Sequence, residues 1–292
     1  MAIRTVRKGG SRFYVNPETR ISYPGVTSIL GMQPKTFLGY WRSKMTAELA
    51  VKSFPFLQEM VETAGKEAAV AYLKGAADRY TKARASIGSE AHDIFERIIR
   101  GDTYYTKRDP FEPTRFLNSL RKDLEPYRAN FIEFMEMVQP EMVSAEDIAW
   151  SDTHQYAGSY DVILRVRLSK DAKGNLYADP VNGAWYLIIG DWKTSKDTYP
   201  DVALQMSAYA HADKLISPDG TERPVPEFDG AAVLHITDTK WSFKPVDAGA
   251  DVFQYFLALR KYFDWDREVS KTVIGRPLAQ GGRLTTGTER RK

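Results

Sequence analysis

The chain has 292 residues, of which 43% are hydrophobic and 27% are charged. This balance is typical of a globular protein and excludes wholesale disorder or a fibrous repeat. No apolar run approaches the ~20 residues that span a bilayer, and the basic start is not followed by the apolar stretch of a secretory signal, so we expect a cytoplasmic protein without a membrane partner. Because the chain has no cysteine, any metal must bind Asp, Glu, His or backbone oxygen, which favours Mg²⁺ or Mn²⁺.

The formal net charge of +3 arises in the C-terminal stretch. Residues 276–292 hold five Arg or Lys against one Glu, which leaves a net charge of about −1 for the rest of the chain. Bulk charge therefore gives no argument for a nucleic-acid partner, and such an argument must rest on local residues. Residues 275–292 are rich in Gly, Thr and Arg, so we expect a basic, disordered tail.

The first part of the chain, to about residue 140, shows mostly helical periodicity. Arg12–Val15 and Ile21–Tyr23 are expected to pair as a hairpin, and Ser28 to cap a short helix at Ile29–Gly31. Longer helices are predicted at residues 36–51, 57–80, 82–100 and 114–138. We expect residues 1–81 to form a helical N-terminal region packed on the core.

The pattern then changes to strands. Strands are predicted at residues 144–150, 159–168, 184–192, 230–237 and 240–246, with helices at 201–215 and 249–270. The segment 184–192 is nearly all apolar, which predicts a central strand covered on both faces. The order of elements predicts an α+β fold whose core spans residues 82–274.

The sharpest local pattern is Asp191-Trp192-Lys193, which directly follows the apolar run 185–189. Strand alternation places Asp191 and Lys193 on one face and Trp192 on the other. Two charges at the end of a buried strand are costly unless a ligand or metal offsets them. A structural ion pair explains the same pattern.

Three further patterns are each weak alone. Gly88-Ser89-Glu90-Ala91-His92 lies on a predicted helix, Gly158-Ser159-Tyr160-Asp161 opens a strand, and Gln205 shares a helical face with Tyr209. A single helical histidine is more often a surface residue, an aspartate at a strand start often accepts turn hydrogen bonds, and a tyrosine is often part of the core.

In this order, the four patterns resemble the RecB-like nucleases of the PD-(D/E)XK superfamily. That group includes nuclease domains of bacterial recombination helicases, CRISPR-associated exonucleases and phage exonucleases similar to lambda exonuclease. The likeness covers about residues 84–210, somewhat under half of the chain. It implies a restriction-endonuclease-like mixed β-sheet flanked by helices. The acid–proline pair that names the superfamily is replaced here by Tyr160-Asp161.

The resemblance also implies roles for particular residues. Asp161, Asp191 and the Trp192 carbonyl would bind Mg²⁺ or Mn²⁺ together with His92, and Lys193 would orient the attacking water and offset charge on the phosphate. Substrate contacts are assigned to Gln205, Tyr209, Ser89 and Arg84. The cysteines that hold an iron–sulfur cluster in some members are absent, so we expect no such cluster.

Some residues keep two interpretations. Glu96 and Glu146 are either extra carboxylates at the metal site or salt-bridged and exposed residues. Trp41, Arg42 and Lys44 either contact a stacked or frayed DNA end or form an ordinary amphipathic helix.

The function expected from the resemblance is a metal-dependent DNA exonuclease in phage DNA recombination, replication or repair, which would act in the host cytoplasm. The alternatives are a non-catalytic DNA-binding accessory protein, an endonuclease of the same fold, and a glycosidase-like hydrolase that uses Asp161 and Asp191. The expected partners are DNA, a phage single-strand annealing protein or recombinase, and further copies of the chain.

Overall fold

The computed structural model describes residues 2–101, 122–279 and 281. At its centre lies a mixed sheet with the strand order β13-β12-β9-β7-β4, to which β8 adds by pairing with β7. Strands β9 and β12 run parallel, and the other neighbours are antiparallel. The strands are β4 (Glu141–Ala145), β7 (Val162–Lys170), β8 (Leu176–Ala178), β9 (Ala184–Lys193), β12 (Gly230–Ile236) and β13 (Trp241–Val246).

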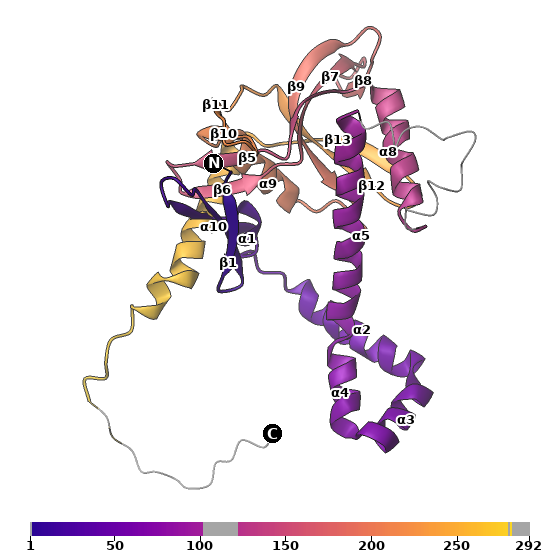
Figure 1. Ribbon diagram of the computed structural model, residues 1–292, viewed down its shortest axis with the longest axis vertical. Helices are drawn as coiled ribbons and strands as arrows, with labels where there is room; N and C mark the ends of the chain where they lie inside the picture. The colour runs from indigo at the N-terminus through magenta and orange to yellow at the C-terminus, as the bar shows by residue number, and fades with distance from the viewer. Residues whose placement is uncertain (1, 102–121, 280, 282–292) are drawn as a thin grey trace.

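Helices cover both faces of this sheet (Figure 1). They are α1 (Val26–Leu30), α5 (Ala76–Ile99), α8 (Glu125–Val138), α9 (Asp201–Ala210) and α10 (Ala250–Arg267). Trp192 and its neighbours on one face pack against α5 and α8, and Ile189 and its neighbours on the other pack against α1, α9 and α10. The central position predicted for 184–192 is therefore confirmed, as is the α+β class. The cover on both faces is complete only for residues 188–192, since Ala184 is exposed and residues 185–187 are half-buried.

Two predicted strands are each broken in two. The segment 144–150 divides into β4 and β5 (Ile148–Ser151) because Glu146 adopts a left-handed backbone with φ 59°, which interrupts the extended ladder. The segment 159–168 divides into β6 (Tyr156–Ser159) and β7. Strands β5 and β6 belong to a second sheet of order β11-β10-β5-β6, so the chain changes sheets at both breaks. The added strands are β10 (Lys214–Ile216) and β11 (Glu222–Pro224).

The N-terminal hairpin is confirmed, since β2 (Ser11–Val15) pairs with β3 (Ser22–Pro24). The prediction missed β1 (Arg4–Lys8), which joins β2 through the two-residue turn Gly9-Gly10, where φ is 57° and 78°. The predicted cap at Ser28 is wrong. Ser28 lies inside α1, and its hydroxyl instead donates to the Arg12 carbonyl and accepts from the Arg12 N–H.

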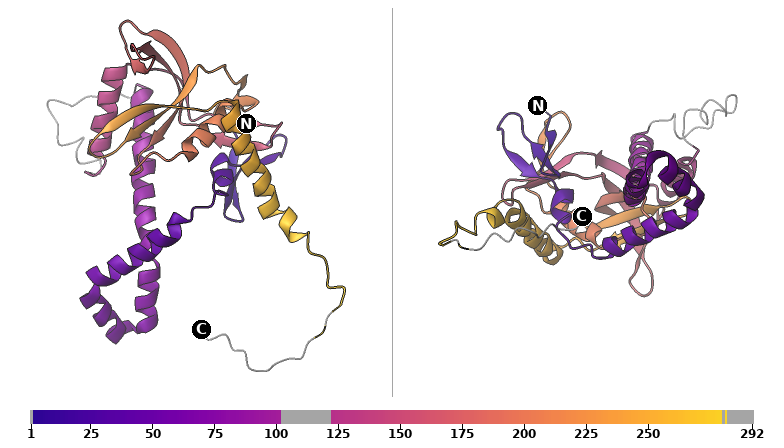
Figure 2. Two further views of the ribbon diagram at one scale, coloured as in Figure 1. Left: turned by 180° about the vertical axis from the view of Figure 1, so that it is seen from behind. Right: turned by 90° about the horizontal axis from the view of Figure 1, so that it is seen from below.

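The helices before the core form an arm that projects away from the sheet (Figures 1 and 2). The helix predicted at 36–51 is confirmed as α2 (Phe37–Lys52), but the single helix predicted at 57–80 is wrong. Its place is taken by α3 (Phe54–Ala64), α4 (Lys66–Lys74) and the start of α5. Gly65, with φ 88° and ψ 165°, is not helical and separates α3 from α4. Helix α5 runs without interruption across the boundary expected at residue 81.

The helix predicted at 201–215 ends early, at Ala210, because the chain turns to pair β10 with β5. The last helix, expected at 249–270, is α10, followed by the short 3₁₀ helix η1 (Val269–Lys271). Residues 114–121 of one predicted helix, and residues 280 and 282–292 of the expected tail, lie outside the described residues. Within the described ranges, no helix combines the length and apolar character needed to cross a bilayer.

Candidate active site

Two neighbouring strands bring the predicted acids together. Asp161 directly precedes β7 and Asp191 lies near the end of β9, in a register where Val162 opposes Gly190. The Asp161 Oδ2 accepts the backbone N–H of Trp192 at 2.6 Å, which ties the start of β7 to the end of β9. The side chain of Trp192 points to the opposite face, as alternation predicted, and its ring meets the edges of Phe131 and Phe134.

Gln205 links the acid and the amine at the end of β9. Lys193 Nζ lies 2.5 Å from Asp191 Oδ2 and donates to Gln205 Oε1 at 3.3 Å. The Gln205 amide donates to Asp191 Oδ1 at 3.0 Å and to the Tyr209 hydroxyl at 3.3 Å. Gln205, to which the resemblance assigned a substrate contact, thus bridges Lys193 and Asp191. Tyr209 is buried behind Gln205, where it orients that side chain.

His92 reaches the same point from helix α5. Its Nδ1 lies 3.6 Å from Asp161 Oδ2, and the ring also has a backbone hydrogen bond with Trp192. Burial lowers the pKa of His92 to about 4, more than nearby Asp191 raises it. The imidazole is therefore neutral at neutral pH and keeps a lone pair that can bind a metal.

The electrostatics of the site are dominated by buried charge. Burial raises the pKa of Asp161, and it raises the pKa of Asp191 to about 6. Burial alone lowers the pKa of Lys193, but the charges of Asp191 and Asp161 outweigh it, so this pKa is raised. With both acids ionised, the site holds two carboxylates against one ammonium, and this deficit of positive charge favours a cation.

The donors fit a hard divalent cation in chemical type. Two carboxylates, a neutral imidazole and the Trp192 carbonyl suit Mg²⁺ or Mn²⁺. Asp191 is only 2% exposed, and its Oδ2 accepts no well-aligned hydrogen bond from any described residue. Among the described residues, no three His, Asp or Glu side chains are already arranged to hold a metal ion. Metal binding therefore requires the side chains of this group to adjust.

Two glycines of the sequence patterns allow close packing around the site. A Cβ on Gly158 would lie 2.7 Å from the Tyr209 ring, and a Cβ on Gly88 would lie 3.1 Å from Thr194 Oγ1. Gly158 thus lets Tyr209 pack beneath Gln205, and Gly88 lets α5 approach the end of β9. These glycines allow the helix that carries His92, and the Tyr209 ring that supports Gln205, to pack against the strands.

The sequence left two interpretations open for Glu96 and Glu146, an extra carboxylate at the metal site or a salt-bridged and exposed residue, and the two residues differ. Glu96 forms an ion pair with Arg100 at 2.8 Å, as the structural interpretation predicted. Glu146 is half-buried and accepts a hydrogen bond from Ser159 Oγ at 3.2 Å. Burial, followed by the charges of Asp161 and Glu96, raises the pKa of Glu146 to about 7. Glu146 is therefore a further carboxylate beside Asp161. The sequence alone did not assign Glu146 to the site.

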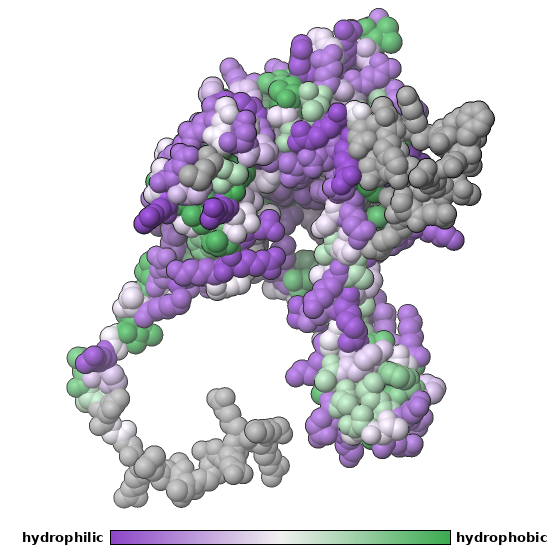
Figure 3. All heavy atoms as spheres, in the orientation of Figure 1, coloured by the Kyte–Doolittle hydropathy of each residue, from purple (hydrophilic) through white to green (hydrophobic). Residues whose placement is uncertain are grey.

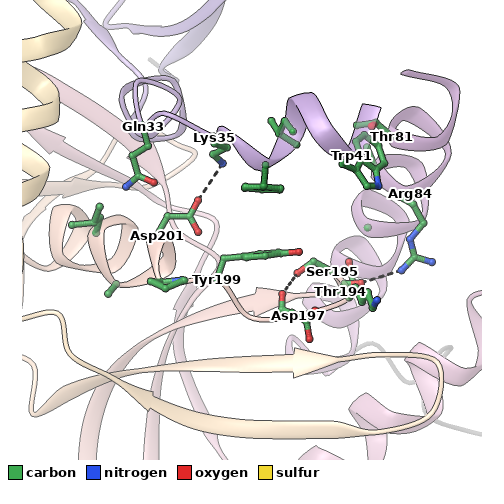
Figure 4. A pocket seen from close by; sticks show the side chains of 18 of the residues that line it. Gln33, Lys35, Trp41, Thr81, Arg84, Thr194, Ser195, Asp197, Tyr199 and Asp201 are labelled. Carbon is green, nitrogen blue, oxygen red and sulfur yellow. Dashed lines mark hydrogen bonds and ion pairs between the residues drawn. The ribbon is translucent and has the colours of Figure 1, made fainter. Parts of the chain in front are cut away.

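The predicted substrate-binding residues differ in position. Arg84 is exposed, and its guanidinium donates to the Thr194 carbonyl at 3.4 Å, so it lies beside the end of β9 (Figure 4). Ser89 is exposed on α5. Arg42 pairs with Asp78 at 3.3 Å and Lys44 lies 3.8 Å from Glu48, so both of these cations have acidic neighbours within the arm.

A cleft of about 2050 Å³ opens beside this group of residues. Its lining includes Gly88, one helical turn before His92, and Thr194, which follows Lys193. No protein-family model matches the chain, and no curated protein sequence matches it either. Any assignment of function therefore rests on the residues and geometry described above.

Proposed function

We propose that the protein is a metal-dependent deoxyribonuclease with the restriction-endonuclease-like fold and the RecB-like site of the PD-(D/E)XK superfamily. One observation carries the proposal: the largely buried carboxylates of Asp161 and Asp191 meet where two adjacent strands begin and end, beside Lys193 and the neutral His92. The site combines hard ligands with a deficit of positive charge. Both features favour a bound divalent cation, which would offset the charge of a phosphodiester that is already negative and develops further charge on its leaving oxygen in the transition state.

In the proposed reaction, the oxygen of water forms a bond to phosphorus while the ester P–O bond breaks. The water gives up one proton to solvent, and the departing oxygen takes up one. When bound by Asp161, Asp191, His92 and the Trp192 carbonyl, Mg²⁺ or Mn²⁺ supplies Lewis-acid polarisation of the phosphate. Lys193 remains charged, because its pKa is raised, and it offsets phosphate charge rather than removing a proton.

Gln205 has a positioning role in this proposal. Its amide oxygen accepts a hydrogen bond from Lys193, and its amide nitrogen donates to Asp191 and to the Tyr209 hydroxyl, which holds Gln205 in place. This arrangement limits the rotation of the acid and the amine relative to each other. Such preorganisation is where a protein site gains most of its electrostatic advantage over water.

Exonuclease activity is proposed over endonuclease activity on the strength of the resemblance. A role in phage DNA recombination, replication or repair, a single-strand annealing partner and assembly of further copies belong to the same proposal. The non-catalytic accessory protein is the competing function, and a cleavage assay separates the two.

The test is cleavage of linear and covalently closed circular DNA, single- and double-stranded, with Mg²⁺, Mn²⁺ or EDTA. Lys193→Ala is compared with Lys170→Ala, which removes an exposed lysine from the same sheet. We expect metal-dependent loss of linear DNA only, abolished by Lys193→Ala and retained by Lys170→Ala.

Cleavage of closed circles would make the protein an endonuclease. DNA binding without cleavage under any of these conditions would support the accessory-protein alternative. Full cleavage by a folded Lys193→Ala variant, or cleavage that persists in EDTA, would refute the proposed site.

A further inference from the structure

The cleft beside the site is bounded by segments that are far apart in the chain. Helices α2 and α5 line one side, α9 and α10 line another, and the loop from Thr194 to Asp201 joins them below (Figure 4). In the space-filling view the molecule is hollowed between the arm and α10 (Figure 3). The lining also includes Thr194 and Leu204, the sequence neighbours of Lys193 and Gln205, so the cleft lies beside the proposed catalytic group.

Aromatic rings from several elements face this cleft. They include Trp41 on α2, Tyr80 on α5, Tyr199 on the loop before α9, and Tyr255 and Tyr262 on α10. The four tyrosines are exposed, with Tyr199 at 48%. Trp41 meets Tyr80 edge to face, with ring centroids 5.9 Å apart. Within the described ranges, the rings of Tyr199, Tyr255 and Tyr262 make no ring contact or side-chain hydrogen bond, so their faces are available to a ligand.

The charges of the lining nearly cancel. Lysine and arginine side chains are balanced by aspartates, and one of these pairs, Lys35 with Asp201, is closed at 3.4 Å. The remaining exposed cations are Arg84, Lys196 and Lys240, against Asp197 and Asp238. A DNA duplex presents its phosphates and is held mainly by an excess of positive charge. A single strand also presents the faces of its bases, which stack on aromatic side chains.

We propose that this cleft binds single-stranded DNA, with bases stacked on Tyr199, Tyr255 and Tyr262 and phosphates contacted by Arg84, Lys196 and Lys240. The bound DNA strand leads to the acids at the start of β7 and the end of β9. The part of this inference that concerns cleavage of the bound DNA rests on the proposed nuclease function. The binding itself is measurable without cleavage.

The test measures binding of a labelled oligonucleotide of about 20 thymidines in EDTA, by fluorescence anisotropy, against a blunt duplex of the same length. We expect wild-type protein to bind the single strand at least about tenfold more tightly than the duplex. Tyr199→Ala and Tyr255→Ala should each weaken binding by about fivefold to a hundredfold, the range for one stacked base.

Two variants serve as controls. Tyr199→Phe keeps the ring and should retain wild-type affinity, because stacking does not need the hydroxyl. Tyr177→Ala removes a tyrosine whose exposure, 50%, is close to that of Tyr199, on β8 outside the cleft, and should leave binding unchanged.

Equal affinity for the duplex and the single strand would overturn the inference, as would Tyr199→Ala and Tyr255→Ala variants that bind like Tyr177→Ala. The two proposals fail separately. Ring-dependent binding of the single strand without metal-dependent cleavage would retain this inference and refute the nuclease. Cleavage that is unchanged in Tyr199→Ala and Tyr255→Ala would retain the proposed nuclease function and refute the binding of single-stranded DNA in this cleft.

Discussion

The buried Asp191 makes a quantitative prediction about stability. Its pKa is raised from an ordinary value of 3.8 to about 6, chiefly by burial. A raised pKa in the folded state means that the stability contributed by the protonated acid is complete below about pH 4 and is lost as the pH rises through about 6. The shift is roughly two pH units, and each unit corresponds to about 1.4 kcal/mol, so the loss is about 3 kcal/mol.

Asp191→Asn replaces this carboxylate by a neutral group of the same shape. We expect the free energy of unfolding of wild type, relative to that of the variant, to fall by about 3 kcal/mol between about pH 4 and about pH 8. Urea unfolding in EDTA at several pH values measures this difference, and groups that titrate equally in both proteins cancel. Asp238→Asn, the same substitution at an exposed position, is the control variant in this series.

A pH-independent difference between wild type and Asp191→Asn would refute the argument from buried charge. Added Mg²⁺ provides a second check at neutral pH. At about a hundredfold excess over its dissociation constant, it should stabilise wild type by about 2.7 kcal/mol and the variant by much less. Equal stabilisation of both proteins would place the metal elsewhere.

Three further predictions concern the surroundings of the site. Gly158→Ala should lower the free energy of unfolding by about 1–3 kcal/mol and reduce cleavage, because the added Cβ displaces Tyr209. Gly230→Ala, at a position with open space around it, should change that free energy by no more than about 0.5 kcal/mol; thermal unfolding and the cleavage assay check both. Phe131→Ala, which removes the ring stacked 4.5 Å from Phe95, should cost about 3–5 kcal/mol by urea unfolding, and a loss under about 1 kcal/mol would contradict its place in the core. Glu146→Gln should gain stability relative to wild type as the pH rises from about 4.5 to about 7, because burial raises the pKa of this acid to about 7; a flat difference in the same urea series would count against that cause.

The sequence by itself determined the central strand and the way its last residues point. The unbroken apolar run from Trp185 to Ile189 favours a strand between two covered faces, and strand alternation then separates Trp192 from Asp191 and Lys193. The pairing of Gln205 with Tyr209 followed from helical spacing in the same way. These features were predictable because they depend on neighbours within a few residues along the chain.

Two other features were not predicted, one because its local signal was missed and the other because it had no local signal. The Gly9-Gly10 turn is a recognisable hairpin signal, and β1 could have been found from it. The break at Glu146 had no such signal, because the strand pattern continues through it. That residue adopts its left-handed backbone where β4 and β5 join different sheets, a consequence of pairing with distant strands.

Only the tertiary structure decided which side chains share the site and the cleft. His92 meets Asp161 because α5 packs across the sheet, and the neutral state of the imidazole follows from burial, which no single segment reveals. Tyr80, Tyr199 and Tyr255 come from separate elements and face one space because the arm, the β9–α9 loop and α10 surround it. The physical reason is that burial and the meeting of distant side chains are set by long-range packing, whereas period and spacing are properties of the local chain.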